Sequence, residues 1–394
     1  MASNLYAASH QWATRPDDER FADLTTMLAA TKAYADSSRE ATIERRALSV
    51  LPDGQNLLLT GTTGAKATIT HYAFGQLARL VQAPAEYLRR LPSTLAATCL
   101  NTGLAKVEAG EKARILFHSN GSLVTRAITS EVYDRVWDYE VVERIGKYLE
   151  GQGWRVPPAR PAREGQKGTR LATEADILPG QGDFGLAVKV GDPIAPAGLY
   201  ASDHDMFAFL VDQADPAFDG QHALNRGVFI QNSEVGDCAL KFKLFVYDNV
   251  CGNHIVWGAS KVTDISVRHI KGEGRASGNT LANALTKWRV ASRSLPSGAE
   301  LSGQIKAMQI KEIAGSKDEV LDALFGFAKV KGLNRLTRPV LTSAYELAEQ
   351  TPRYGSPRSV WGMINGLTEV SQSAHTDVRT DLDVQAGRLS EIAF

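Results

Sequence analysis

The chain has 394 residues, its 44 basic and 44 acidic side chains cancel at neutral pH, and 43% of its residues are hydrophobic. These values are ordinary for a folded globular protein of two or three structural units, and they exclude a largely disordered chain. Because the formal net charge is zero, any attraction to nucleic acid has to come from a local basic surface. The spacing of Cys99, Cys238 and Cys251 excludes a disulfide framework and a cysteine-based zinc site.

Residues 1–20 lack the basic stretch followed by an apolar stretch that marks a signal peptide. No run along the chain approaches the ~18 consecutive apolar residues of a membrane span. We therefore expect a cytoplasmic protein that does not enter the membrane, and the sequence predicts no cofactor.

Residues 1–152 are predicted to form an N-terminal α+β region. Two β-prone runs flank Asn120-Gly121, a dipeptide typical of type I′ turns, and this pattern predicts a β-hairpin. A long amphipathic helix is expected next, because apolar residues recur there at helical spacing. These residues are Val132, Val136, Val142, Ile145 and Leu149.

Residues 153–190 are predicted to be a loop or linker rich in proline and glycine. Up to residue 170 this segment is also the most basic short stretch of the chain, with only Glu164 to oppose its cations. A solvated connector is the simplest interpretation, and the alternative is an electrostatic contact to phosphates. The basic residues are Arg155, Arg160, Arg163, Lys167 and Arg170.

Residues 191–300 are predicted to form a central β-meander followed by a helix, and residues 301–394 a C-terminal helical region. Turn residues separate the β-prone runs of the central part, as they do in antiparallel sheets. In the C-terminal part, Ser316 and Glu319 have the spacing of a helix capping box. The whole pattern predicts an α+β fold with an antiparallel β-meander flanked by helices, preceded by an α/β region that contains a hairpin.

The strongest functional signal lies in residues 240–247, which strand alternation divides between two faces. One face is apolar and is expected in the core: Leu240, Phe242, Leu244 and Val246. The other face carries two ammonium groups and two aromatic rings: Lys241, Lys243, Phe245 and Tyr247. Lysines that pair with phosphates and rings that stack on bases are typical of surfaces that bind single-stranded nucleic acid. The alternative is a face whose lysines reach solvent and whose rings lie beneath a helix.

Residues 226–293 contain ten basic and five acidic side chains, a surplus of five in a chain that is otherwise balanced. Arg289 and Arg293 are one helical turn apart and are expected to extend the same track of phosphate contacts. The predicted nucleic-acid contacts are Lys241, Lys243, Phe245, Tyr247, Arg268, Lys271, Arg275, Arg289 and Arg293.

The tripeptide Asp203-His204-Asp205, together with His254, offers carboxylate and imidazole groups suited to a divalent metal ion. Neighbouring residues of a strand point to opposite faces, so the tripeptide reaches one ion only if it lies in a special turn. The chain also lacks a phosphate-binding P-loop and a nucleophile elbow. We therefore predict no catalytic residue and no metal site, and keep a metal-dependent nuclease as the enzyme alternative.

Residues 226–259 contain an Asn232-Ser233-Glu234-Val235-Gly236 turn and a Val250-Cys251-Gly252-Asn253 step. With AFGQLARLVQAPAEYLRRLP upstream and SVWGMINGLTEV downstream, these motifs resemble a phage/plasmid-like protein family classed as a domain of unknown function. The resemblance implies an intracellular role in a phage, prophage or plasmid setting, and it supplies no catalytic residues.

The predicted order of three strands and a helix ending in WRVASR is similar to Rad52-like single-strand annealing proteins, many of which form rings around a basic groove. The expected function is therefore binding or annealing of single-stranded DNA by a phage, prophage or plasmid protein during replication or recombination. A homo-oligomer is the expected assembly. The alternatives are the metal-dependent nuclease and a phage protein that binds a host partner.

Overall fold

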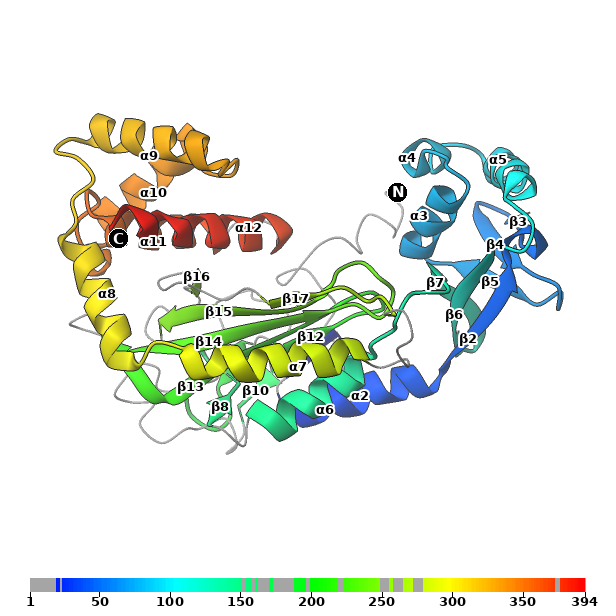
Figure 1. Cartoon of the computed structure of the whole chain (residues 1–394), viewed down its shortest axis with the longest axis horizontal. Helices are drawn as coiled ribbons and strands as arrows, with labels where there is room; N and C mark the ends of the chain where they lie inside the picture. The colour runs from blue at the N-terminus through cyan, green and yellow to red at the C-terminus, as the bar shows by residue number, and fades with distance from the viewer. Residues whose placement is uncertain are drawn as a thin grey trace.

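The computed structural model has the α+β fold that the sequence predicts, with two large, mostly antiparallel sheets and helices packed against them. Figure 1 shows an N-terminal sheet with its helices at one end, a long central sheet, and a group of C-terminal helices at the other end. The structure describes residues 19–21, 23–149, 153–156, 160–161, 170–172, 188–195, 199–218, 223–248, 255–257, 265–271, 279–372 and 376–393.

The N-terminal part is built on a six-stranded sheet with the strand order β2-β6-β7-β5-β4-β3, in which only β5 and β7 are parallel. Its strands are β2 (Ser38–Glu44), β3 (Ser49–Asp53), β4 (Asn56–Thr60), β5 (Lys66–Ile69), β6 (Lys112–Asn120) and β7 (Ser122–Ser130). Helices α3 (His71–Leu80), α4 (Ala85–Leu88) and α5 (Ser93–Lys106) enclose an apolar core against this sheet.

Strands β6 and β7 form the hairpin that the sequence predicts around Asn120-Gly121. Asn120 pairs with Ser122, so Gly121 lies at the tip with a φ of 73°. This left-handed conformation costs glycine little because it has no Cβ atom. The predicted hairpin is confirmed.

The central sheet has the order β1-β12-β13-β14-β15-β16, and β8 and β17 pair with β13 and β15 respectively. All of its strand pairs are antiparallel. Its strands are β1 (Arg20–Phe21), β8 (Trp154–Arg155), β12 (Leu199–Ala201), β13 (Met206–Phe218), β14 (Ala223–Asn232), β15 (Leu240–Asp248), β16 (Ile255–Trp257) and β17 (Ile265–Val267).

The two faces of the central sheet are covered by different helices (Figure 1). One face packs against α2 (Leu24–Asp36), α6 (Asp138–Leu149) and α7 (Asn279–Ala291), and these elements share one apolar core. On the opposite face, the ring of Phe229 contacts those of Phe207 and Phe209. Val384 of α12 (Thr376–Gly387) packs against this aromatic cluster, so the C-terminal helices cover part of the second face.

The C-terminal part is helical, as predicted, and has its own apolar core. The capping box expected of Ser316 and Glu319 is present, and a second one joins Ser297 and Glu300. The helices before α12 are α8 (Gly298–Ile310), α9 (Lys317–Lys331), α10 (Arg338–Gln350) and α11 (Val360–Gln372). Among all the helices that the structure describes, none combines the length and the apolarity that a membrane crossing requires.

The cores divide the chain differently from the boundary predicted at residue 152. Although α2 and α6 lie within residues 1–152, their apolar faces complete the core of the central sheet, whereas β2–β7 and α3–α5 enclose a separate core. The predicted long helix is also shorter than expected, because α6 begins at Asp138. Val132 lies outside it, is 56% exposed, and accepts a hydrogen bond from the backbone of Lys271.

Residues 153–190, predicted to be a loop or linker, contribute strands to two sheets. Strand β8 pairs with β13 at the edge of the central sheet. Strands β9 (Arg160–Pro161) and β10 (Arg170–Leu171) flank β11 (Pro193–Ala195) in a small three-stranded sheet. The described parts of this segment therefore pair with strands that follow it in the sequence.

Candidate nucleic-acid interface

Strand β15 has the alternation that the sequence predicts, with Leu240 and Phe242 fully buried in the core beneath α7. Lys241 and Lys243 consequently lie on the opposite face, where both are half-buried. Lys241 is flanked by Gln231 of β14 and Ser266 of β17, and Lys243 is paired across the strands with Phe229. Phe229 belongs to the aromatic cluster against which α12 packs, so Lys243 lies beside a partly covered region.

The other residues predicted for this track are only partly described. Phe245 and Tyr247 lie in β15, but the orientation of their side chains falls outside what the structure describes. Arg268 is exposed just after β17, and Lys271 is half-buried beside the turn that follows β7. Arg275 lies outside the described residues. The predicted stacking of bases on the β15 rings therefore stays a prediction.

The central sheet separates Arg289 of α7, and Arg293 of the turn after it, from the β15 lysines. Trp288 stacks on Phe242 with 5.6 Å between ring centroids, which places α7 on the Leu240 face of the sheet. Arg289 and Arg293 are therefore on the other side of the sheet from Lys241 and Lys243. The single phosphate track expected from the sequence is divided between two faces.

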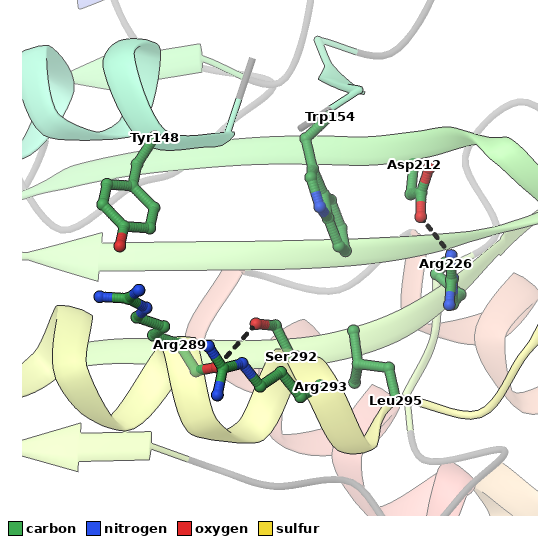
Figure 2. Close-up of a pocket in the computed structure, with 8 residues that line it drawn as sticks. All are labelled: Tyr148, Trp154, Asp212, Arg226, Arg289, Ser292, Arg293 and Leu295. Carbon is green, nitrogen blue, oxygen red and sulfur yellow. Dashed lines mark hydrogen bonds and ion pairs between the residues drawn. The ribbon is translucent and has the colours of Figure 1, made fainter. Parts of the chain in front are cut away.

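Arg289 and Arg293 line a pocket at the end of α7 (Figure 2). Its volume is about 370 Å³, within the range of about 300–1,000 Å³ that is usual for ligand pockets. The walls come from the end of α6, from β8, from β13 and β14, and from the turn after α7. The lining residues are Tyr148, Trp154, Asp212, Arg226, Arg289, Ser292, Arg293 and Leu295.

Among the residues that the structure describes, Arg226 is the one pocket arginine with a carboxylate partner. Arg226 donates to Asp212 and also lies 3.5 Å from a carboxylate oxygen of Asp215. Arg289 and Arg293 are exposed, and in the described part of the chain neither guanidinium has a carboxylate within salt-bridge distance. A phosphate group carries the negative charge that would complement these two side chains.

The two aromatic residues of the pocket have different roles. Trp154 is only 4% exposed and its ring meets that of Trp288 edge-on, so it belongs to the core. Tyr148 is half-buried and its side chain extends toward Arg289 (Figure 2). Its ring is the surface available to a base. No sequence pattern marks Tyr148, because it occurs in an ordinary helical repeat and meets α7 only in the folded chain.

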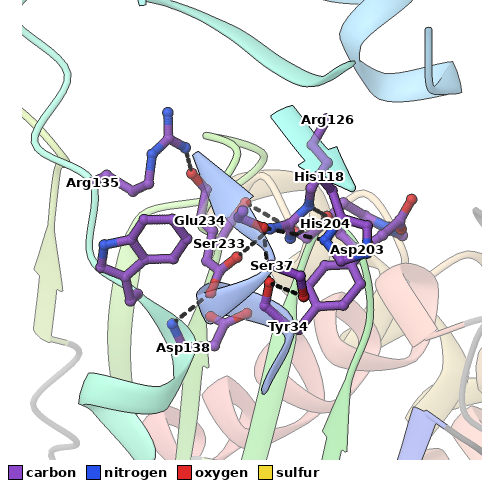
Figure 3. Close-up of polar contacts among 12 residues, drawn as sticks. Tyr34, Ser37, His118, Arg126, Arg135, Asp138, Asp203, His204, Ser233 and Glu234 are labelled. Carbon is purple, nitrogen blue, oxygen red and sulfur yellow. Dashed lines mark hydrogen bonds and ion pairs between the residues drawn. The ribbon is translucent and has the colours of Figure 1, made fainter. Parts of the chain in front are cut away.

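A second polar cluster lies where the N-terminal part meets the central sheet (Figure 3). Its centre is an ion pair between Arg126 of β7 and Glu234 of the turn after β14, with 2.8 Å between guanidinium nitrogen and carboxylate oxygen. The two side chains are 1% and 2% exposed. A buried ion pair of this kind stabilises the protein only while both partners are present, because either charge alone is costly to bury.

Arg126 also binds two other segments of the chain. Its Nη2 atom donates to the main-chain oxygen of Asp203 at 2.8 Å, and its guanidinium lies over the Tyr34 ring, 4.3 Å from the centroid. The His118 ring stacks on that of Tyr34, with 4.1 Å between the ring centroids. Burial, together with the neighbouring Arg126 charge, lowers the pKa of His118. One guanidinium therefore joins α2, β7 and the turns at 203 and 234.

The motif Asn232-Ser233-Glu234 is part of this cluster and is buried. Ser233 Oγ accepts from the backbone of Gly236 and Asp237, which confirms the predicted turn. Asn232 donates to the Asp138 carboxylate at 2.7 Å, and the backbone N–H of Asp138 donates to Glu234 at 3.0 Å. These residues hold the N-terminal end of α6 and do not line the β15 lysine face.

Asp138 is a buried acid beside a second acid. Burial, and then the Glu234 charge, raises the pKa of Asp138 well above its usual range. The folded protein therefore keeps a proton on Asp138 that the unfolded chain releases above a pH of about 3.9. Its contribution to stability is complete below that pH, and is lost as the pH rises through the pKa of the folded state.

We expect Asp138→Asn to remove this loss, since asparagine has no proton to release and can still accept from Asn232. The free energy of unfolding of the variant, relative to that of the wild type, should increase between pH 5 and pH 8 by up to about 1.4 kcal/mol per pH unit. Urea unfolding at both pH values measures the difference. The exposed Asp53→Asn is the matched control, and a difference independent of pH for Asp138→Asn would contradict the assignment.

The metal alternative rests on the turn between β12 and β13. Asp203, His204 and Asp205 all lie in this turn, and His254 lies outside the described residues. Ser202 Oγ accepts from the backbone of His204 and Asp205, which makes the special turn that the tripeptide requires. The structure thus brings His204 and Asp205 to one side, with Nε2 and Oδ1 3.5 Å apart.

Comparison of the chain with known protein families, with curated proteins and with solved structures finds no match in any of the three.

Proposed function

We propose that this chain binds single-stranded nucleic acid and that Arg289 and Arg293 hold its phosphates. The supporting observation is the pocket in which two exposed arginines, one helical turn apart, have no carboxylate partner among the described residues. An arginine guanidinium presents a planar fork of donors that matches phosphate geometry. One fork comes from the last turn of α7 and the other from the 3-10 turn at residues 292–294 that follows it, so both can contact phosphates of one strand.

Two further features support a nucleic-acid ligand over a small anion. Tyr148 places a half-buried ring beside Arg289, and base stacking on such a ring tolerates every sequence. Trp154, which lines the pocket, is also the second residue of the segment 153–170, the most basic short stretch of the sequence.

The wider proposal is a single-stranded DNA-binding or annealing protein of a phage, prophage or plasmid, acting as an oligomer in replication or recombination. The sequence motifs at 232–236 and 250–253 support this setting through their resemblance to the phage/plasmid-like family. The sequence order of β-prone runs followed by a helix ending in WRVASR supports the annealing role through its similarity to Rad52-like proteins.

The test is a titration of the purified chain with a fluorescently labelled single strand at several salt concentrations. Each phosphate that is neutralised contributes about −0.7 to the slope of log affinity against log salt, so two arginines predict a slope of about −1.4 or steeper. The mass of the complex, measured in parallel, gives the subunit number. A slope near zero, or no binding at low salt, would contradict the proposal. It would favour the alternative function, that of a phage protein that binds a host partner.

A further inference from the structure

The turn between β12 and β13 gathers side chains that have no part in the arginine pocket. Ser202 fixes this turn by accepting from two backbone N–H groups, and its hydroxyl donates to Asp205 Oδ1 at 2.7 Å. The Tyr200 hydroxyl donates to the same oxygen at 3.2 Å. Asp205 is only 4% exposed, so its carboxylate is held in one orientation.

Three ligand groups of the kind that bind metal ions converge beside this turn. One ligand atom from each of His204, Asp205 and Asp237 lies within 4.8 Å of those of the other two. His204 Nε2 and Asp205 Oδ1 are 3.5 Å apart. Two ligands bound about 2.1 Å from a tetrahedral metal ion are about 3.4 Å apart, so this pair already has the required separation. Asp237 is exposed on the turn after β14, and its carboxylate lies within the same 4.8 Å of both other groups.

A third carboxylate, that of Asp203, orients the imidazole. Asp203 Oδ1 lies 2.7 Å from His204 Nδ1, the geometry of a hydrogen bond in which Nδ1 donates. In that tautomer Nε2 carries the lone pair, and it is this nitrogen that lies near Asp205 Oδ1. A carboxylate that accepts from one nitrogen of a ligating histidine, and hydrogen bonds that hold a ligating carboxylate, are recurrent outer-shell features of metal sites.

We propose that His204, Asp205 and Asp237 bind a divalent first-row metal ion. One imidazole and two carboxylates suit Mn²⁺ and Zn²⁺ better than Mg²⁺ or Ca²⁺, which prefer oxygen ligands alone. Three protein ligands leave a coordination position for water or a phosphate oxygen, as in catalytic metal sites. The proposal is independent of nucleic-acid binding at α7, since the two sites share no residue.

Binding of Mn²⁺ to the full-length chain, followed by the electron paramagnetic resonance signal of the unbound ion, tests this proposal. We expect the wild type to bind about one Mn²⁺ per chain, and Zn²⁺ to displace it. Asp203→Asn should weaken binding about 10- to 100-fold, as the loss of an outer-shell carboxylate does. Asp237→Asn and His204→Gln each remove a ligand and should weaken binding at least as much.

Asp53→Asn is the matched control, because Asp53 is exposed on β3 and remote in the fold from this turn. It should bind Mn²⁺ as the wild type does. Circular dichroism spectra of all variants establish that each is folded, and the exposed position of Asp237 makes that variant the decisive one. Failure of the wild type to bind either ion would overturn the proposal. So would Mn²⁺ binding that is unchanged in Asp237→Asn.

Discussion

Replacement of both Arg289 and Arg293 by glutamate should weaken binding of a single-stranded oligonucleotide about 100-fold or more. A hydrogen bond to a charged group contributes about 1.5–3 kcal/mol, so two arginine–phosphate contacts contribute about 3–6 kcal/mol. With about 1.4 kcal/mol for each tenfold change in affinity, their loss predicts a decrease of about 100-fold or more. Both side chains are exposed, so the free energy of unfolding should change by no more than about 0.5 kcal/mol.

The β15 lysines provide a matched control for this experiment. Lys241→Glu with Lys243→Glu changes the formal charge by the same amount, but these residues lie on the other face of the sheet from α7. Binding in the α7 pocket predicts that the lysine variant retains affinity within about tenfold. If the lysine variant loses binding and the arginine variant keeps it, the ligand occupies the β15 face that the sequence predicted. Equal losses in both would indicate a response to overall charge alone.

The β15 prediction illustrates what the sequence determines and what it leaves open. Alternation is a local property of strands, and it correctly assigned Leu240 and Phe242 to the core and Lys241 and Lys243 to the opposite face. The face on which the next helix packs is a property of the whole chain. The contact of Trp288 with Phe242 places α7 on the apolar face of the sheet. The arginines after Trp288 and the lysines of β15 therefore lie on different faces, although the sequence predicted a single track.

The hairpin at Gly121 and the capping box at Ser316 were predictable for the same reason, since both depend on residues a few positions apart. The division of the chain into separate apolar cores was not predictable from the sequence. The apolar faces of α2 and α6 indicate that each helix packs on something, but not that both pack on strands that follow residue 190. Periodicity predicts a buried face without naming its partner.

The buried cluster around Arg126 was also beyond sequence reasoning, because its members come from segments that are remote in the chain. The available signal was a single arginine inside a β-prone run, between Thr125 and Ala127, both of which are fully buried. Charged residues are almost never fully buried unless they are paired. An arginine in such a run indicates a buried acidic partner, but Glu234 is identified only by the fold.

Replacement of Arg126 by methionine should lower the free energy of unfolding by about 3–5 kcal/mol, the usual cost of breaking a buried ion pair from one side. The variant leaves the Glu234 carboxylate 2% exposed without its cation, and it removes the hydrogen bond to Asp203 and the contact with Tyr34. Urea unfolding followed by circular dichroism measures the loss. Glu234→Gln leaves the Arg126 guanidinium buried without its anionic partner, and it should destabilise the protein to a similar extent.

Two comparisons separate the cost of an unpaired buried charge from the loss of a contact. Arg338 and Asp322 form an ion pair whose side chains are 47% and 65% exposed, and Arg338→Met should cost less than about 1 kcal/mol because water already solvates both charges. The double variant Arg126→Met with Glu234→Gln should lose less than the sum of the two single variants, since no charge remains buried alone. Strictly additive losses, or an Arg126→Met loss no larger than that of Arg338→Met, would mean that this ion pair does not hold the N-terminal part to the central sheet.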